Sequence, residues 1–571
     1  MLKPRGPSAI SGADARDESS DARRRFLATL AGTAATPIAA RAGQAADGTS
    51  RFEDAGKMPA STVLEADLCI IGAGAAGITL ARALADSGLS ILLLEAGAEQ
   101  IDGRTQALCR GDQTGLRYYD LAACRLRYLG GTTNHWAGYS HPALPADFEP
   151  RADIGVKGWP IGFAELSPYI AQAAGVLGYA DSEFDPAAAA RAAGHAEPLI
   201  DSEAQQQLRT GLFQIARRYR FAERHGAELA SQPRLRVILN ANVVHLQLDP
   251  KATQVREVLV KSFDGPPLRV RAARWVLAAH AIESARLLLA SDDIAPGGIG
   301  NKHGQVGRCF MEHPRVTSGV LMPTERFPEI YDEQWATARN RNWTLGLAEP
   351  AQRQHGVLQY QCRFLPIYAH DQAKAAARRL LGGWWDPAEA KTVQALGQLV
   401  GHLGDTFSLI GLALTGQRGR PLAYRLEHRI EQCPNPDSRV VLTSERDALG
   451  VRKAALNWAL NGIDERGFAV GQAVLTQQLT RLGLGRVEAP ALTPASIRTR
   501  VNGLNHHTGT TRMSDGPRDG VVDADCKVHG VANLYVAGGG VFARIGAANP
   551  TLLIVALALR LAEHLKHGAR V

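Results

Sequence analysis

Two neighbouring histidines near the end of the chain, and an asparagine after them, have side chains suited to proton transfer. His506 and His507 stand before Thr508-Gly509-Thr510, and Asn549 stands directly before Pro550. An imidazole can take a proton from a hydroxyl group near neutral pH, and an amide can hold the same oxygen by a hydrogen bond. A lone histidine is more often structural, and the residue types alone leave the choice between the two histidines open.

A glycine-rich segment near the start of the chain predicts a dinucleotide site. A strand, a helix and a second strand are expected in turn at residues 67–71, 78–86 and 90–94. Gly72, Gly74 and Gly77 have the GxGxxG spacing, which permits a tight turn, a close approach of the backbone to a pyrophosphate and close packing of helix on strand. Glu95 follows the second strand, where a carboxylate can bind ribose hydroxyls. The pattern suits NAD and FAD alike.

A second glycine loop follows where an NAD enzyme would continue to alternate strands and helices. Residues 127–138 include Gly130-Gly131-Thr132-Thr133-Asn134-His135-Trp136. Adjacent glycines beside small hydroxyl residues suit close contact with a bulky ring or a phosphate. The segment resembles the flavin-contact loop of the glucose–methanol–choline (GMC) oxidoreductase family, especially the branch with gluconate, fructose and pyranose dehydrogenases and oxidases.

Further segments resemble the same branch in the same order, over residues 60 to 565. They lie at residues 158–161, 166–169, 275–291, 307–314, 434–440 and 506–553. Two positions depart from the family pattern. His280 stands where the family usually has glycine, and Gly538 stands where many members have an aspartate that binds flavin. The sugar-dehydrogenase branch tolerates glycine at the second position, so FAD binding is still expected.

The resemblance implies FAD as the cofactor and assigns the site residues. In the family, the catalytic histidine precedes the Gly-Thr pair by three positions, which selects His506 with His507 as the alternative, and the second catalytic group maps to Asn549. The implied cofactor contacts are Gly72, Gly74, Gly77, Glu95, Gly130, Gly131, Thr132, Asn134, His135, Val243, Gly539, Pro550 and Thr551. Pro550 also predicts the first turn of a helix whose N-terminus faces the flavin. A covalent bond between His135 and the flavin is a possibility that we do not favour.

The implied reaction is oxidation of the CH–OH group of a sugar, polyol or other alcohol. His506 takes the hydroxyl proton and a hydride passes to flavin N5. We expect a dehydrogenase that passes its electrons to a quinone or to a separate cytochrome or other acceptor protein. An oxygen-reducing alcohol or pyranose oxidase that produces peroxide shares every motif and stays open, as does a flavoprotein of other chemistry on the same fold.

The predicted fold class is α/β, with a Rossmann-like FAD-binding domain of the GMC type and a substrate domain built on an antiparallel sheet. The FAD-binding domain is expected at residues 62–150, 230–320 and 500–571, and the substrate or cap domain at 151–229 and 321–499. Residues 439–442 and 454–458 are predicted strands of the substrate-domain sheet. Residues 370–415 predict a helical insertion, which could be a lid, a hydrophobic entry, a dock for a partner or a packed surface subdomain.

The first 45 residues resemble a twin-arginine export signal with its leader. A polar stretch precedes Arg23-Arg24-Arg25-Phe26-Leu27, a weakly apolar run extends to Ala40, and Ala40-Arg41-Ala42 offers a cleavage site. The alternative is a disordered tail that happens to hold arginines. The signal predicts export to the periplasm, and no transmembrane segment is expected after processing.

Composition and charge give no support to nucleic-acid binding, a metal site or an attached haem. The net charge of +8 is a mild excess over 571 residues and is not gathered in Lys/Arg tracts with aromatics, so nucleic-acid binding has no support. The seven cysteines contain no CxxC pair, which disfavours a metal site or attached haem. We predict that they are mostly buried thiols.

Overall fold

The computed structural model describes residues 52–179, 184–195, 200, 202–217, 219–368 and 420–567. Residues 50–365 and 425–571 form one compact unit, which contains the whole site described below. The predicted export leader at 1–45 and the predicted insertion at 370–415 lie outside the described residues.

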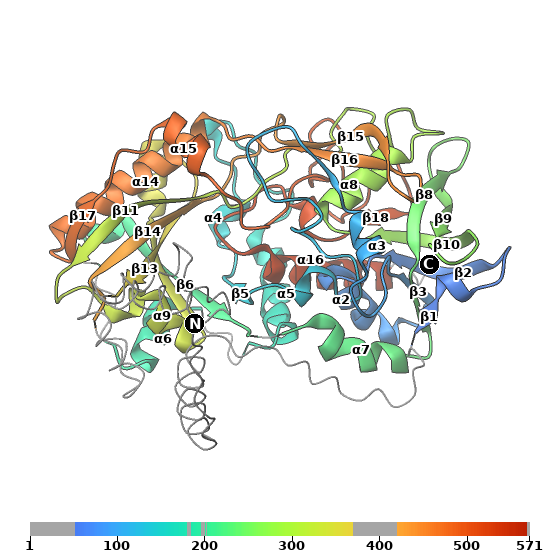
Figure 1. The fold of residues 1–571 in the computed structure, drawn as a ribbon, viewed down its shortest axis with the longest axis horizontal. Helices are drawn as coiled ribbons and strands as arrows, with labels where there is room; N and C mark the ends of the chain where they lie inside the picture. The colour runs from blue at the N-terminus through green and yellow to red at the C-terminus, as the bar shows by residue number, and fades with distance from the viewer. Residues whose placement is uncertain are drawn as a thin grey trace, which may run out of the picture. The chain divides into compact units, whose positions relative to one another are not determined.

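Eight of the described strands form a mixed sheet with a parallel centre (Figure 1). The order is β1 (Glu53–Asp54), β7 (Leu235–Leu239), β3 (Ile91–Leu94), β2 (Val63–Ile71), β10 (Leu268–Leu277), β9 (Val255–Lys261) and β8 (Asn242–Leu248), with β18 (Leu534–Val536) also pairing with β10. β9 runs antiparallel to β10, and β8 antiparallel to β9. The other neighbours in the sheet are parallel. β10 is long enough to pair with β9 at its start and with β18 at its end.

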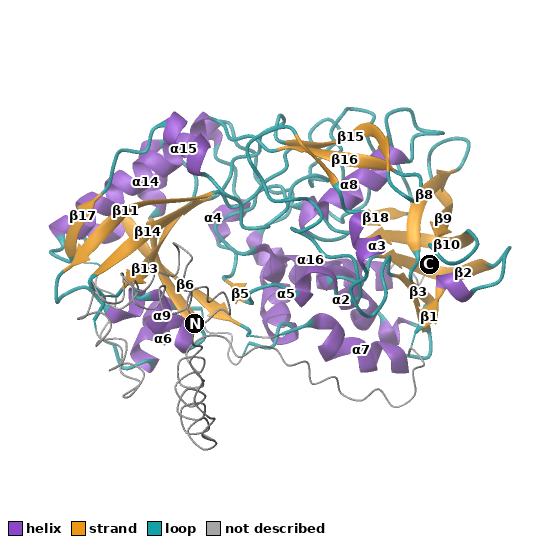
Figure 2. Cartoon of the chain, in the orientation of Figure 1, coloured by secondary structure: helices purple, strands orange, loops and turns teal. Residues whose placement is uncertain are grey.

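The parallel strands are covered by helices, which explains their apolar sequence. β3 is Ile-Leu-Leu-Leu and is buried at every position, as a strand covered on both faces must be. The main helices around this sheet are α2 (Ala75–Ala83), α5 (Phe163–Val176), α7 (Phe221–Ser231), α8 (Ala281–Ala290) and α16 (Pro550–His567). α16 packs against both α2 and α5 (Figure 2). The glycine turn before α2 is therefore fixed by the apolar core.

Seven described strands form the second large sheet. The order is β17 (Gly485–Glu488), β11 (Arg315–Pro323), β14 (Ala423–Ile430), β13 (Tyr360–Ile367), β12 (Arg341–Leu347), β6 (Leu208–Ile215) and β5 (Tyr139–Ser140). α14 (Gly462–Arg481) packs against this sheet, where a side chain at Gly471 would collide with the Tyr360 ring. The next residue, Gln361, points the other way and donates a hydrogen bond to the Ala547 carbonyl. This sheet therefore has one face toward α14 and another toward the loop that precedes α16.

The strands predicted at residues 439–442 and 454–458 exist, but their predicted sheet was wrong. β15 (Arg439–Arg446) and β16 (Arg452–Asn457) pair with each other, and β16 pairs in parallel with β4 (Gly111–Gln113). They form a separate three-stranded sheet that packs on α8. Strand periodicity gives the strand but not its partner, and β4 lies more than 300 residues earlier in the chain.

Short helices complete the described chain. The α-helices are α3 (Gly103–Ala107), α4 (Pro145–Phe148), α6 (Pro186–Ala192), α9 (Glu333–Ala338), α10 (Glu349–His355) and α15 (Pro494–Arg500). The 3-10 helices are η1 (Ala55–Lys57), η2 (Ala85–Ser87), η3 (Gly131–Asn134), η4 (Ala152–Ile154), η5 (Ala204–Gln206), η6 (Glu329–Tyr331) and η7 (Gly539–Val541). Several begin with proline, which suits the first turn because its missing N–H has no helical partner there.

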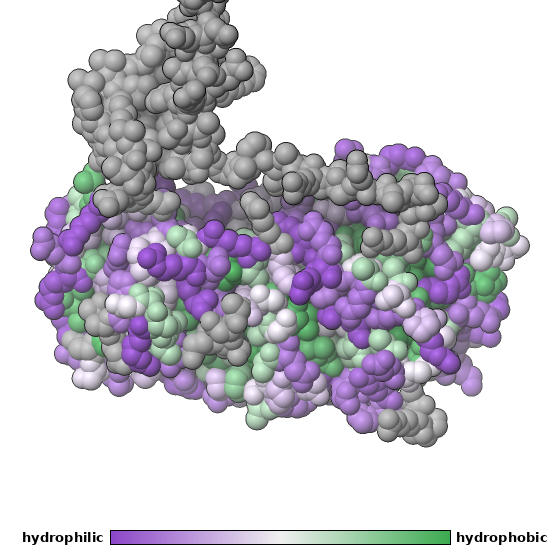
Figure 3. All heavy atoms as spheres, turned by 90° about the horizontal axis from the view of Figure 1, so that it is seen from below, coloured by the Kyte–Doolittle hydropathy of each residue, from purple (hydrophilic) through white to green (hydrophobic). Residues whose placement is uncertain are grey.

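The distribution of apolar residues is that of a packed core with a polar surface. All seven cysteines are buried free thiols, which confirms the prediction. On the face shown in Figure 3, hydrophilic residues predominate and the hydrophobic ones form small separate patches. Within the described part of the chain, no helix is both long and apolar enough to cross a membrane.

Candidate active site

A cavity of about 700 Å³ lies where the central parallel strands end. Gly72 follows β2, Glu95 follows β3, Ala278 follows β10 and Gly538 comes soon after β18, and all four residues line the cavity. In open parallel sheets, ligands bind at the carboxyl ends of the strands, where the strand order reverses. The cavity continues past His506 to the polar face of the seven-stranded sheet.

The turn between β2 and α2 leaves room for a phosphate. Gly72 has a φ of +106°, which permits the tight turn, and a Cβ on Gly77 would lie 1.9 Å from the Gly72 carbonyl oxygen. A Cβ on Gly74 would meet nothing within 4 Å, and Gly74 lines the cavity. Gly74 caps α2 without a side-chain hydrogen bond. The first amides of α2 are therefore available to an anion.

Glu95 is held beside this turn by backbone amides. Its Oε2 accepts from the Ala73 N–H at 2.8 Å, and its Oε1 accepts from the Gly97 N–H at 3.1 Å. Burial raises the pKa of Glu95, and these two hydrogen bonds oppose that rise. A carboxylate oxygen can accept more than one hydrogen bond, so both oxygens retain capacity for ribose hydroxyls.

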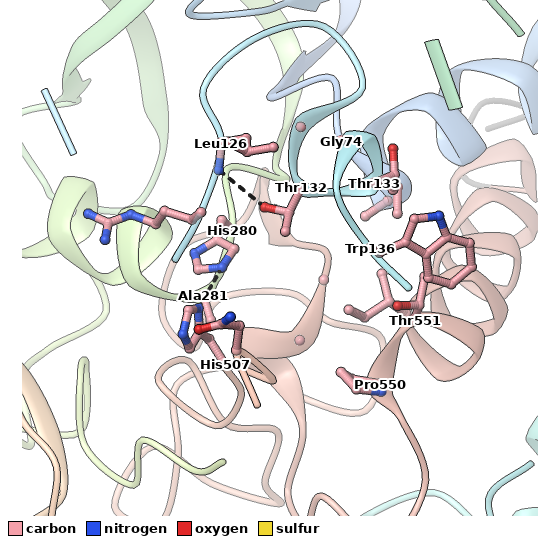
Figure 4. A pocket seen from close by; sticks show the side chains of 18 of the residues that line it. Gly74, Leu126, Thr132, Thr133, Trp136, His280, Ala281, His507, Pro550 and Thr551 are labelled. Carbon is pink, nitrogen blue, oxygen red and sulfur yellow. Dashed lines mark hydrogen bonds between the residues drawn. The ribbon is translucent and has the colours of Figure 1, made fainter. Parts of the chain in front are cut away.

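The second glycine loop lies directly against the first. A Cβ on Gly131 would be 3.2 Å from the Cα of Gly74, and the Gly130 N–H donates to the Ala73 carbonyl at 2.9 Å. The Thr132 hydroxyl oxygen accepts from the Leu126 N–H at 3.3 Å, as Figure 4 shows at the rim of the cavity. Contact between two loops of small residues leaves backbone and hydroxyl groups facing the cavity.

The predicted cofactor contacts fall into two groups. Those that line the cavity are Gly72, Gly74, Glu95, Gly131, Thr132, His135, Val243, Gly539, Pro550 and Thr551. Gly77, Gly130 and Asn134 are not among the lining residues. Asn134 donates to the Leu129 carbonyl at 2.8 Å and would contact any Cβ placed on Gly130. These three residues shape the two loops, because their contacts are with the chain itself.

A second helix begins at the cavity. α16 starts at Pro550, as the sequence predicted, and Asn549, Pro550 and Thr551 all line the cavity. Figure 4 shows Pro550 and Thr551 at the cavity together with Trp136, whose indole N–H donates to the Tyr219 carbonyl at 2.6 Å. The N-terminus of α16 favours negative charge in the cavity.

The two predicted catalytic histidines differ in their hydrogen bonds. His506 contacts His313, with 2.8 Å between their Nδ1 atoms, and His313 Nε2 lies 2.8 Å from the Gly546 carbonyl oxygen. A carbonyl can only accept, so His313 donates from Nε2. The lone pair on Nδ1 of a neutral His313 then accepts from His506 Nδ1–H. The remaining ring nitrogen of His506, Nε2, carries a lone pair.

Both ring nitrogens of His507 are engaged in a buried chain of hydrogen bonds. His280 Nδ1 accepts from the Ile282 N–H at 3.3 Å, so His280 Nε2 donates to His507 Nδ1 at 2.9 Å (Figure 4). His507 Nε2 then donates to the Tyr118 oxygen at 2.8 Å, and the Tyr118 hydroxyl donates to Glu312. His280 has a φ of +77° and caps α8 with its side chain. His280, the residue that departs from the family pattern, is therefore the first member of this series of hydrogen bonds.

Glu312 joins the two histidine systems. Its carboxylate accepts the backbone N–H groups of Leu504, His506 and His313 at 2.8 to 3.0 Å. Burial raises the pKa of Glu312, and its hydrogen bonds from Tyr118 and these amides oppose that rise. Segment 307–314 resembles a family motif, but the sequence assigns no role to Glu312, His313 or Tyr118. Nothing in their spacing indicates that they meet residues almost 200 positions away.

The environment keeps His506 neutral. Burial lowers the pKa of His506 well below its usual value, and His313, Arg429 and Arg315 lower it further. Burial likewise lowers the pKa of His313 to about 4. A histidine that is neutral at the working pH is ready to accept a proton.

Two regions of the chain match known family models. Residues 434–558 match the family model "GMC oxidoreductase", and residues 70–106 match "NAD(P)-binding Rossmann-like domain". The chain is 26% identical to the fructose dehydrogenase large subunit of Gluconobacter japonicus over 88% of this chain and 97% of that protein. It is 28% identical to paromamine 6'-oxidase of Streptomyces fradiae over 87% of this chain and 90% of that protein.

A solved structure has the same fold. The crystal structure of pyridoxine 4-oxidase from Mesorbium loti matches with a TM-score of 0.54 and 20% identity, over 88% of this chain and 99% of that chain. The match to the GMC oxidoreductase model lies in residues 434–558, and the α/β fold class is as predicted. The protein is an FAD-dependent oxidoreductase. The open Gly74, the N-termini of α2 and α16 at the cavity and Glu95 fit that dinucleotide.

Proposed function

We propose that the protein oxidises a CH–OH group of a sugar, polyol or other alcohol, with His506 as the base and Asn549 as the oxygen-binding partner. The observation that carries the proposal is the unequal bonding of the two histidines. Hydrogen bonds among the described residues engage the ring of His506 only through Nδ1, whereas they engage both nitrogens of His507. This difference supports His506 as the residue that meets substrate, as the family spacing had implied.

The proton path follows from the tautomer that His313 imposes. Gly546 and His313 keep a proton on Nδ1 of His506, so its Nε2 takes the proton of the substrate hydroxyl. Asn549 orients the same oxygen from the start of α16. FAD, when bound by the two glycine loops and Glu95, supplies the hydride acceptor at N5. Loss of a proton and a hydride converts the CH–OH group to a carbonyl.

We infer that the FAD is bound without a covalent link. His135 lines the cavity from the end of η3 but is exposed, and the loop contacts that would hold a flavin are made by its neighbours Gly131 and Thr132. Acid precipitation of the purified protein should leave the yellow colour in the supernatant. Colour that stays with the pellet, and is lost from it in His135→Ala, would establish the covalent bond.

We propose a dehydrogenase that passes electrons to a quinone, a cytochrome or another separate acceptor. The similarity to a fructose dehydrogenase named as a large subunit supports a separate partner, although the chain is also 28% identical to paromamine 6'-oxidase. Reduced protein exposed to air should stay bleached for many seconds in the absence of an added quinone. Rapid reoxidation with formation of peroxide would show an oxidase instead.

We propose export by the twin-arginine route to the periplasm, supported by Arg23-Arg24 ahead of the weakly apolar run. Such a route suits a protein that folds around FAD before export. Replacement of both arginines by lysine should retain the protein in the cytoplasm. Unchanged export of this variant would refute the assignment.

The experiment that tests the function is anaerobic bleaching of the flavin absorbance by a panel of sugars, polyols and less polar alcohols. Bleaching by one class should be lost in His506→Ala, while FAD stays bound. A yellow protein that no alcohol bleaches would favour flavin chemistry of another kind on this fold.

A further inference from the structure

The seven-stranded sheet presents charged side chains to the cavity. On β13, Tyr360 and Cys362 alternate with Gln361 and Arg363, and Arg363 lines the cavity. Side chains alternate between the two faces of a strand, so the residues beside Arg363 point away from the cavity. Arg429 on β14 also lines the cavity. Such a wall can bind a polar part of the substrate.

Three arginines come together on this wall from three adjacent strands. Arg315 begins β11, Arg429 lies near the end of β14, and Arg363 lies in β13. The Ile430 N–H donates to the Pro314 carbonyl at 3.1 Å, which holds the end of β14 beside the start of β11. All three arginines line the same cavity as His506.

Glu427 lies between the three guanidinium groups. Arg429 donates to its Oε1 from Nε at 2.8 Å, and Arg315 donates to its Oε2 at 3.1 Å. Arg363 Nη1 lies 4.0 Å from Glu427 Oε1, and Arg363 Nη2 also pairs with Glu333. Burial raises the pKa of Glu427, but Arg429, Arg363 and Arg315 together lower it below its usual value. Glu427 is therefore an anion that orders the cluster.

The ion pairs of this wall leave positive charge unbalanced. Within the described chain, three arginines share two carboxylates, Glu427 and Glu333. The side chain of Arg363 is 10% exposed, and its Nε has no hydrogen-bond partner among the described residues. Burial, followed by repulsion from Arg429, lowers the pKa of Arg363 to about 10. A buried donor without an acceptor is costly, and the arginines outnumber the carboxylates, so the wall can accept one further anionic group.

We propose that Arg363 and Arg429, with Arg315 beside them, bind a carboxylate of the substrate, and that the substrate is a hydroxy acid such as a sugar acid. Guanidinium groups bind carboxylates with paired hydrogen bonds, which fix orientation as well as charge. The inference rests on the proposed function, because the carboxylate is bound on one wall while the substrate CH–OH group meets His506. The carboxylate itself is unchanged in the reaction: the hydroxyl proton goes to His506, the hydride goes to FAD, and a keto or aldehydo acid leaves.

Paired substrates test the inference directly. The FAD-loaded protein is mixed anaerobically with gluconate and with glucitol, and with glucuronate and glucose, so that each acid has a neutral counterpart. We expect an acid to reduce the flavin with a kcat/KM at least about 30-fold above that of its neutral counterpart, as for a buried charge pair. Equal rates for acids and neutral compounds would overturn the inference and leave the proposed function intact.

Variants of the arginines test whether these residues cause the preference for acids over neutral compounds. Arg429→Gln and Arg363→Gln should each raise KM for the acid by about 30-fold or more, with little change for the neutral counterpart. Arg429→Lys keeps the charge but loses the paired geometry, and should recover part of the loss. Arg425→Gln is the matched control, because Arg425 lies on the same strand but is exposed. The flavin spectrum and Tm establish that each variant is folded.

A binding measurement separates failure of this inference from failure of the proposed function. Propionate, which cannot be oxidised here, should perturb the flavin spectrum of the wild-type protein and raise its Tm, and propionamide should not. Propionate binding that is lost in Arg429→Gln would uphold the anion site even if no alcohol reduced the flavin. Stronger binding of inorganic phosphate than propionate, with faster oxidation of a sugar phosphate than a sugar acid, would overturn the carboxylate assignment.

Discussion

The two walls of the cavity are built in different ways. The wall formed by the turn after β2 and by η3 is built from glycines, alanines and threonines with their backbone amides, and a Cβ at Gly74 would enter empty space. The wall formed by β13 and β14 consists of long charged side chains held by one another. A wall made of backbone groups suits the cofactor, which all members of a family share. A wall made of side chains can vary with the substrate. His506 lines the same cavity as both walls.

The largest effect is expected on the backbone wall. Gly74→Val should abolish FAD retention through gel filtration, because the added side chain occupies the space beside the amides of α2. Gly74 has a φ of −87°, so the change fills the cavity without straining the backbone. Gly103→Ala, which also meets open space but does not line the cavity, should retain its FAD. Retention of FAD by Gly74→Val would break the distinction between the walls.

Replacement of the proposed base should be the next largest effect and should spare cofactor binding. His506→Ala should reduce the rate of flavin reduction by about 10²- to 10⁴-fold, the usual contribution of a positioned base. The measurement is stopped-flow absorbance under anaerobic conditions with FAD content determined in parallel. His507→Ala should affect Tm more than the rate, since His507 is buried and its nitrogens are engaged. The opposite ranking would assign the base to His507.

The backbone wall was largely predictable from the sequence, and the side-chain wall was not. The glycine spacing, Glu95 and the helix that begins at Pro550 are local patterns, so their geometry follows from neighbouring residues. Arg363 and Arg429 lie in ordinary alternating strands, and nothing local indicates that they meet each other.

The contacts around the histidines could not be predicted for the same reason, because they join segments that lie far apart in the sequence. The family spacing selected His506, but its tautomer depends on His313 and Gly546, which the fold brings from two other segments. The sheet assigned to β15 and β16 was wrong for the same reason, because strand pairing over long separations leaves no trace in periodicity.

His313 should behave as a positioning residue with a smaller effect. His313→Leu removes the acceptor for His506 Nδ1–H and should lower kcat for flavin reduction by about tenfold or more, with a smaller change in KM. His313→Asn offers an amide oxygen in place of Nδ1 and should recover part of the rate. Equal activity of the leucine and asparagine variants would show that the imidazole only fills space.

The smallest effect is expected in the pH profile. Because the pKa of His506 is lowered, the base stays neutral as the pH falls, so kcat/KM should not decline through pH 6.5, the usual range of histidine. His313 contributes to that lowering, so His313→Asn should move the acidic limb to higher pH. The profile is measured from pH 4.5 to 8 by flavin reduction, with protein folding checked at each pH. An acidic limb centred at 6.5 in the wild-type protein would contradict the described environment.

The alternation along β13 has a consequence for how this enzyme could acquire new specificities. Tyr360 packs on Gly471 of α14, while Gln361 and Arg363 are directed to the site. Selection acting on substrate choice and selection acting on thermostability therefore fall on alternate positions of one strand. Mutational libraries confined to the odd-numbered positions should yield altered substrate ranges with few unfolded members, whereas libraries at the even-numbered positions should mostly yield unfolded protein.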